Sequence, residues 1–218
     1  MGKQVGQIQV SGKFGALVGA KGRNGRVYLR AKSDKAPKAP TTAQMVVQAR
    51  FKTIGQLATG AKQAIKMGLK NKAKQLKCSI YNAFVKLNWA AVTANNLGQT
   101  TITWGNIVIS DGKLPNATFS TPLFEAPLQV DVDITGNASY AGADASDEVY
   151  VFLFNEDSNE GLLSSPVART ATTMSIPVPA PWNGCKVRAY GFTSAGVNNT
   201  EMKGEVSPSI YFGTGNIA

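Results

Sequence analysis

The sequence predicts an α+β fold in which an extended basic arm, a two-helix segment and an antiparallel β-sandwich follow one another along the chain. Three observations predict it. Glycines and cations alternate through residues 11–30, apolar residues recur every three or four positions over residues 42–69, and from Gly98 short apolar runs alternate with Gly, Asn, Asp and Pro turns. The three regions are residues 1–40, 41–97 and 98–218.

The arm is predicted to form a β-hairpin over Phe14–Ala31, because Val27–Leu29 lies between arginines in the alternating pattern of a strand and Asn24-Gly25 is a strong two-residue turn signal. A flexible Gly-rich tail is the alternative. We interpret the glycines as allowing close backbone packing in an interface, since glycine permits conformations and approaches that other residues do not. These glycines are Gly12, Gly15, Gly19, Gly22 and Gly25. The Pro/Lys segment Lys32–Pro40 is predicted to be an extended linker.

Two helices are predicted after the linker. Thr41 and Gln44 have the spacing of a capping box, which places the start of the first helix at Thr42, and the apolar repeat carries it to Leu69. Its apolar face is Val47, Phe51, Ile54, Ala58, Ala61 and Ile65. A basic bend over Lys70–Lys77 is expected to lead into a second helix over Ser79–Thr93. The two apolar stripes can bury against each other or in a subunit interface.

The remainder is predicted to be a seven-stranded antiparallel sandwich, because short strands separated by turn residues are typical of that architecture. The predicted strands are Thr101–Ile109, Leu128–Thr135, Glu148–Phe154, Ser164–Thr170, Thr172–Val178, Cys185–Thr193 and Val206–Phe212. The run Val187–Phe192, a long turn and Ser207–Phe212 together resemble the last two strands of an immunoglobulin-like or fibronectin type III domain.

Charge divides the chain more sharply than its net value of +10 indicates. Residues 1–95 carry 18 Lys and Arg against one acid, a net charge of +17, whereas residues 96–218 carry five against 12 acids, a net charge of −7. A basic region of this kind favours acidic protein surfaces or nucleic acid as partners. The residues predicted to make assembly or polyanion contacts are Lys13, Lys21, Arg23, Arg26, Tyr28, Arg30, Lys32, Arg50, Lys62, Lys66, Lys70, Lys72 and Lys74. Tyr28 is a candidate for base stacking, or packs within its own domain.

Enzymatic chemistry is not predicted. The chain has no histidine, which excludes Ser-His-Asp and Cys-His catalysis, and residues 11–30 contain neither a P-loop nor a dinucleotide-binding glycine pattern. Asp131 and Asp133 could form an acid pair or metal site, but a solvent-facing strand is the favoured interpretation, and a polar turn is likewise favoured over a calcium loop for residues 155–161. We therefore predict no catalytic residue, cofactor or metal.

Two further features concern environment. Cys78 and Cys185 are predicted to be unpaired thiols. The chain has no apolar run of membrane-spanning length, and its first residues lack the apolar stretch of a signal peptide, so we expect neither membrane insertion nor secretion by that route.

The chain resembles a family of proteins of similar length that is common in Bacteroidota genomes and in the phages that infect them. The resemblance is carried by four elements, S-G-K-x-G-x-x-V-G at Ser11–Gly19 followed by the basic strand Arg26–Arg30, T-x-A-Q through Phe51, Tyr81–Lys86, and Trp182–Ser194. It implies a phage virion component, made in the host cytoplasm, whose partners are itself and other virion proteins. It transfers no catalytic residue. Binding of nucleic acid through the basic half is the alternative function.

Overall fold

The computed structural model describes residues 12–15, 17–21, 27–31, 39–125 and 128–217, and it divides the chain into two compact units, Met1–Pro40 and Thr41–Ala218. The α+β class is confirmed, with most strands in the C-terminal half. The boundary predicted at residues 97–98 falls inside the second unit, because the helices and the sheets there share a hydrophobic core.

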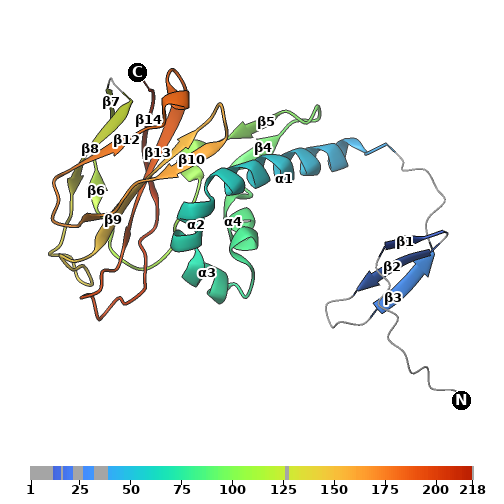
Figure 1. Ribbon diagram of the computed structural model, residues 1–218, viewed down its shortest axis with the longest axis horizontal. Helices are drawn as coiled ribbons and strands as arrows, with labels where there is room; N and C mark the ends of the chain where they lie inside the picture. Colours follow the sequence, from blue (N-terminus) through green and yellow to red (C-terminus); the bar gives the residue numbers. More distant parts are fainter. Residues whose placement is uncertain (1–11, 16, 22–26, 32–38, 126–127, 218) are drawn as a thin grey trace, which may run out of the picture. The chain divides into compact units, whose positions relative to one another are not determined.

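The first unit contains a three-stranded antiparallel sheet in the order β1-β2-β3 (Figure 1). Its strands are β1 (Gly12–Phe14), β2 (Leu17–Lys21) and β3 (Val27–Ala31). The ladder between β2 and β3 pairs Leu17 with Ala31 and Lys21 with Val27, which confirms the predicted hairpin pairing. Strand β1 is an unpredicted third member, turned back at Gly15 with a positive φ of 56°. The predicted Asn24-Gly25 turn and residues 32–38 of the linker lie outside the described residues.

The second unit begins with four helices. They are α1 (Thr42–Gly60), α2 (Lys62–Gly68), α3 (Lys70–Gln75) and α4 (Ile80–Asn88). The predicted capping box is confirmed, since the Gln44 amide donates to the Thr41 hydroxyl over 3.3 Å and the Thr41 amide donates to the Gln44 side chain over 2.9 Å.

Three predictions in the helical region are wrong in detail. The single helix predicted to Leu69 is interrupted at Ala61, because the backbone of Gly60 lies directly against Asn159 of a strand turn and the chain bends there. The predicted bend Lys70–Lys77 is mostly helix α3, held by the buried side chains of Leu69 and Ala73. The helix predicted to Thr93 ends at Asn88, after which the chain enters a strand.

The strands of the second unit form two larger antiparallel sheets and one small hairpin. The hairpin is β4 (Val92–Ala94) with β5 (Thr100–Ile102). The five-stranded sheet contains β10 (Glu160–Leu163), β11 (Val167–Ala168), β9 (Glu148–Asn155), β13 (Lys186–Ser194) and β14 (Ile210–Asn216). The four-stranded sheet contains β12 (Thr173–Pro177), β8 (Gln129–Thr135), β6 (Thr118–Phe119) and β7 (Leu123–Glu125).

The predicted strands near β8, β9, β12 and β13 are confirmed, and the others differ. Residues 101–109 are a strand only to Ile102, followed by a 3₁₀ turn at Trp104–Asn106, because Ile107 and Ile109 turn into the helical core. The strand predicted over residues 164–170 is the two-residue β11, and the preceding β10 was not expected. The last strand begins at Ile210 rather than Val206, which makes only an isolated bridge to Ser194.

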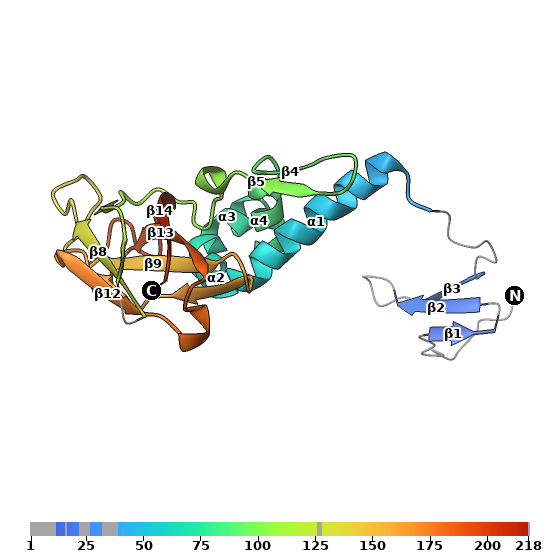
Figure 2. The same ribbon diagram turned by 90° about the horizontal axis from the view of Figure 1, so that it is seen from above.

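The second unit has three layers, with the helices on one face of the five-stranded sheet and the four-stranded sheet on the other (Figures 1 and 2). The sequence of β9 follows from its place between the two layers, since a strand covered on both faces is a nearly continuous apolar run, here Val149–Phe154. Val149, Val151 and Leu153 face the second sheet, whereas Phe152 and Phe154 face the helices. In β8, by contrast, only alternate residues are buried, because its outer face meets solvent.

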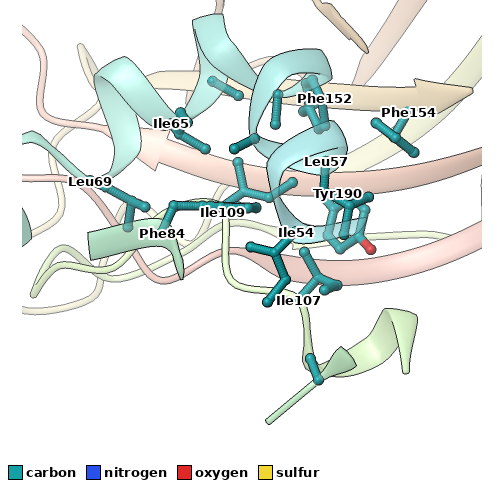
Figure 3. Close-up of a cluster of buried hydrophobic side chains, with 14 of the residues drawn as sticks. Ile54, Leu57, Ile65, Leu69, Phe84, Ile107, Ile109, Phe152, Phe154 and Tyr190 are labelled. Carbon is teal, nitrogen blue, oxygen red and sulfur yellow. The ribbon is translucent and has the colours of Figure 1, made fainter. Parts of the chain in front are cut away.

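Two cores hold these layers together. Figure 3 shows the core between helices and sheet, where Ile54, Leu57, Ile65 and Phe84 meet the aromatic side chains of β9 and Tyr190 of β13. The predicted helix face is thus buried from Ile54 onward against the chain's own sheet. The second core lies between the two sheets, and its side chains include Val130, Val132, Met174, Ile176 and Trp182.

Glycines in β14 set the spacing of the two sheets along one side. A Cβ atom at Gly213 would lie 2.4 Å from Pro122, and one at Gly215 would lie 2.2 Å from the ring of Phe124. The absent side chains therefore make room for β7, which closes this side of the two packed sheets.

Candidate assembly and polyanion-binding surfaces

The arm sheet carries four of the predicted contact residues. Lys13 lies in β1, Lys21 in β2, and Tyr28 and Arg30 in β3. The register aligns Lys13 with Val18 and Val18 with Arg30, so these three residues form one row across the sheet. Directly opposite residues in a ladder share a face, so the two cationic positions lie on the same face. Arg23, Arg26, Lys32, Gly22 and Gly25 lie outside the described residues.

The opposite face of the arm sheet carries apolar residues and one cationic position, Lys21. The row beside the cationic one aligns Gly12, Gly19 and Leu29, and strand alternation places it on the other face. Leu29 is 56% exposed and Leu17 on the same face is 44% exposed. Within the described residues, this single-layer sheet therefore leaves large apolar side chains uncovered, together with the outer edges of β1 and β3.

The helices carry a basic surface made of lysines. Lys62, Lys66, Lys70 and Lys74 recur every four residues along α2 and α3, and all four are exposed. No ion pair involves any of them within the part of the chain that the structure describes. These four residues, here called the lysine row, remain available to an external polyanion.

Two predicted contact residues have structural partners instead. Arg50 donates from its Nε to the carbonyl oxygen of Val92 over 2.7 Å and from a terminal nitrogen to that of Trp89, and its guanidinium lies 4.0 Å from the centre of the Trp89 ring. It therefore joins α1 to the segment that follows α4. Lys72 forms a 2.8 Å ion pair with Asp111. Nothing in the sequence pattern separates these two cations from the exposed ones.

The first turns of α1 are exposed although their pattern is amphipathic. Val47 is 43% exposed and Phe51 is 48% exposed, so the predicted apolar face is only partly buried. Phe51 contacts the Trp89 ring at a centroid distance of 4.8 Å, and Tyr81 of α4, beside Gly55, is 47% exposed. The side chains of Val47, Phe51 and Tyr81 make a small apolar surface on the helical layer.

A buried ion pair that the sequence analysis does not predict organises one end of the sheets. Arg169 and Asp147 are both fully buried, and their charged groups lie 2.6 Å apart. Asp147 also accepts hydrogen bonds from the amides of Asp144 and Gly196 and from the Asn199 side chain, at 2.9–3.0 Å. Arg169 donates further bonds to the carbonyl oxygens of Gly136 and Pro115. The pair is fully hydrogen-bonded and joins five loop segments, so its role is structural.

Asp131 and Asp133 lie on a solvent-facing strand and residues 155–161 form a polar turn, which are the interpretations favoured from the sequence. Asp131 and Asp133 occupy the outer face of β8, where Asp131 accepts hydrogen bonds from Gln129 at 2.8 and 2.9 Å. Residues 155–161 contain a tight turn in which Asn155 accepts from the amides of Asp157 and Ser158. Among the described residues, no group of three or more Cys, Asp or Glu side chains is placed to hold a metal. Both cysteines are free.

A groove runs between the two sheets on the side opposite β7. It has a volume of about 290 Å³ and is lined by Leu162 of β10, Val167 of β11, and Thr173, Met174 and Ile176 of β12. A cavity of about 480 Å³ near Trp182 shares Leu162 with this groove. The second core is therefore accessible along the β12 side, whereas β7 covers it along the β14 side.

These features define the class of the molecule, which is a polarised α+β protein with a basic arm, a basic helical layer and a sandwich-like acidic part. Residues 9–213 match the family described as Family of unknown function (DUF6266), and the chain belongs to this family. No curated protein and no solved structure matches the chain. No helix among the described residues is long and apolar enough to cross a membrane.

Proposed function

We propose that this protein is a structural subunit of a large assembly, and specifically of a phage virion as a capsid- or tail-associated component, produced in the host cytoplasm. The observation that supports this most directly is the arm. It is a separate unit whose sheet leaves Leu17 and Leu29 exposed, and it opens a region of net charge +17 on a chain whose remainder carries −7. Exposed apolar residues on a small charged unit are typical of a surface that is covered by a partner.

The second unit would supply the body of the subunit. Its helices bury most of their apolar face internally, yet Val47, Phe51 and Tyr81 remain exposed, and so do the four lysines of the lysine row. We propose that this layer faces neighbouring subunits and that the two sheets form an immunoglobulin- or fibronectin III-like module displayed on the assembly. The strand pairs β9–β13 and β13–β14 support that comparison.

Deleting residues 1–32 tests the proposal. The full chain is expected to form oligomers at micromolar concentrations in sedimentation velocity, and the truncated chain is expected to stay monomeric with an unchanged near-ultraviolet circular dichroism spectrum. Mass spectrometry of purified phage particles released by a bacterium that carries this gene tests the virion role. A truncated chain that assembles like the full one, or particles that lack the protein, would contradict the respective part of the proposal.

Binding of nucleic acid through the helical layer is a second candidate function, and the lysine row specifically favours it. Contacts between lysines and phosphates release counterions, so affinity falls with salt in proportion to the number of contacts. Replacing all four lysines by Gln is expected to reduce the log–log salt slope for duplex DNA by about 3.6 units, while replacing them by Arg preserves it. A slope near zero for the unmodified protein would rule this function out.

A further inference from the structure

The open side of the sandwich is bordered by an edge strand with unpaired backbone groups. Within the described residues β12 pairs only with β8. The carbonyl oxygen of Thr172 accepts a hydrogen bond from the amide of Ile134, and the amide of Val178 donates one to the carbonyl oxygen of Leu128. Because hydrogen-bonded pairs alternate along an antiparallel ladder, even-numbered residues of β12 bond inward and the amides of Thr173 and Ser175 point outward.

The groove beneath this edge exposes part of a hydrophobic core. Met174 and Ile176 belong to that core, and Leu162 and Val167 pack against it while remaining partly exposed. A strand added to the edge of β12 would place alternate residues over this groove and the others on the outer face, beside Thr173 and Ser175. The groove therefore fits an extended segment with apolar residues at every second position.

The outer face next to this edge is acidic. In the register, Ser175 lies opposite Asp131 and Thr173 lies opposite Asp133. A residue on an added strand would be two strand spacings from these carboxylates, roughly 10 Å, which is within the combined reach of an Arg and an Asp side chain. The segment that fits is thus apolar on one face and cationic on the other.

Strand β3 of the arm has this chemistry. It is five residues long, as β12 is, and it is an edge strand of its own sheet among the described residues. Strand alternation places residues Val27 and Leu29 on one face and residues Tyr28 and Arg30 on the other. Leu29 is one of the most exposed apolar side chains of the described chain, at 56%.

We propose that β3 of one copy pairs with β12 of a second copy, so that the arm sheet continues the four-stranded sheet of its neighbour. The face with Val27 and Leu29 is then on the groove side, and the position of Arg30 is on the side of the sheet that carries Asp131 and Asp133. This inference rests on the proposed assembly function and identifies the partner surface for the arm. Each copy offers one β3 edge and one β12 edge, so the contact is head-to-tail and extends into rings or filaments.

Ser175→Pro in the full chain tests the pairing, with Ser175→Ala as its control. Proline removes an amide that points outward and is not needed by β8, whereas alanine keeps it. Self-association measured by sedimentation equilibrium is expected to weaken about tenfold with Ser175→Pro, the loss expected for one strand-pairing hydrogen bond. It is expected to stay within about twofold with Ser175→Ala. Equal association of both variants with the unmodified chain would overturn the proposal.

A cross-linking experiment gives a second measurement that does not depend on the stability of the proline variant. Two versions of the full chain, both carrying Cys78→Ser and Cys185→Ser, bear Tyr28→Cys and Thr173→Cys respectively. When the two are mixed with an added thiol oxidant, copper phenanthroline, a disulfide between the two copies is expected. Thr118→Cys, which is exposed on β6 at the far side of the same sheet, is the control and should not cross-link.

The outcomes separate this proposal from the assembly function. If the unmodified chain stays monomeric at all concentrations, the assembly function fails and the pairing fails with it. If it assembles but Thr118→Cys cross-links as well as Thr173→Cys, only the β3–β12 pairing is wrong. If a chain carrying both Tyr28→Cys and Thr173→Cys cross-links internally and the mixture does not, the second copy is the wrong occupant.

Discussion

At the scale of single residues, the stability of the second unit depends on a few buried polar groups. Burial on its own would raise the pKa of Asp147, but hydrogen bonds from Asn199, from the amides of Asp144 and Gly196, and from Arg169 lower that pKa below its ordinary value. The carboxylate is therefore more stable in the folded chain than in the unfolded one. Because breaking a buried pair leaves an uncompensated charge, its partner Arg169 makes this site sensitive to substitution.

Asp147→Asn is expected to lower the free energy of unfolding by about 3–5 kcal/mol at pH 7, since Arg169 stays buried and charged. The folded-state pKa of Asp147 is depressed, so its contribution to stability is complete above the pKa of the unfolded chain and is lost as the pH falls through the lower, folded value. Urea denaturation between pH 7 and pH 3 should therefore show a shallower pH dependence for this variant. Asp133→Asn, at an exposed position, should leave the free energy of unfolding at pH 7 unchanged; a similar loss there would contradict the assignment.

Arg50 provides a second prediction at this scale. Its contacts hold α1 to the segment after α4, although by charge alone it resembles the lysines of the lysine row. Arg50→Lys keeps the charge but cannot reach both carbonyl oxygens and stack on Trp89, so the unfolding free energy should fall by about 2 kcal/mol with no change in DNA affinity. Lys66→Gln should instead weaken DNA binding and change the free energy of unfolding by less than about 0.5 kcal/mol. Thermal denaturation and salt-titrated binding measure the two effects separately.

At the scale of elements, close backbone contacts decide where helices end. The junction of α1 and α2 lies at Gly60, where a Cβ atom would be 2.5 Å from the carbonyl oxygen of Asn159 and 2.7 Å from the Phe154 ring. Gly55 lies in the same helix, but a Cβ atom there would meet only the Tyr81 hydroxyl, at 3.2 Å. Gly55 lies inside α1 and Gly60 is its last residue, and only Gly60 has backbone from another element against it.

Gly60→Ala is expected to destabilise the protein by about 1–3 kcal/mol, because the backbone of the β9–β10 turn cannot move away easily. Gly55→Ala is expected to be neutral or to stabilise by up to about 1 kcal/mol, since alanine has the higher helix propensity and the exposed Tyr81 side chain can shift. Chemical denaturation of both variants checks the difference. Equal effects would show that the contact between α1 and β10 does not limit packing.

Elements coded by local residues could be predicted from sequence, and those set by distant contacts could not. The capping box at Thr41 and the alternation in β8 are local, and both were expected. The break at Gly60 depends on Asn159, nearly a hundred residues away, and β4 follows a helix whose apolar pattern continues through it. The candidate surfaces divide in the same way, because only the structure separates the exposed lysine row from Arg50 and Lys72, which have partners.

At the scale of the whole molecule, the two cores make residues 41–218 one cooperative unit. Strand β9 contributes Phe152 and Phe154 to the core beneath the helices and Val151 and Leu153 to the core between the sheets. The boundary predicted from the sequence at residue 97 does not include this coupling. An apolar stripe on a helix is equally consistent with burial against a partner subunit. In the structure β9 is covered by the helices on one face and by the four-stranded sheet on the other. The helix stripe is therefore buried within the chain and not against a partner subunit.

The second unit is therefore expected to unfold in a single transition. Helix content followed by circular dichroism at 222 nm and the fluorescence of Trp182, which is buried in the core between the sheets, should give the same midpoint in urea. For a fluorescence signal from Trp182 alone, Trp89→Phe and Trp104→Phe serve as the background. Phe84→Ala beneath the helices and Val132→Ala between the sheets should each lower the midpoint seen by both probes, since either cavity destabilises the whole unit. If Phe84→Ala moves only the helical signal, the helices and sheets fold as independent domains and the single-unit description is wrong.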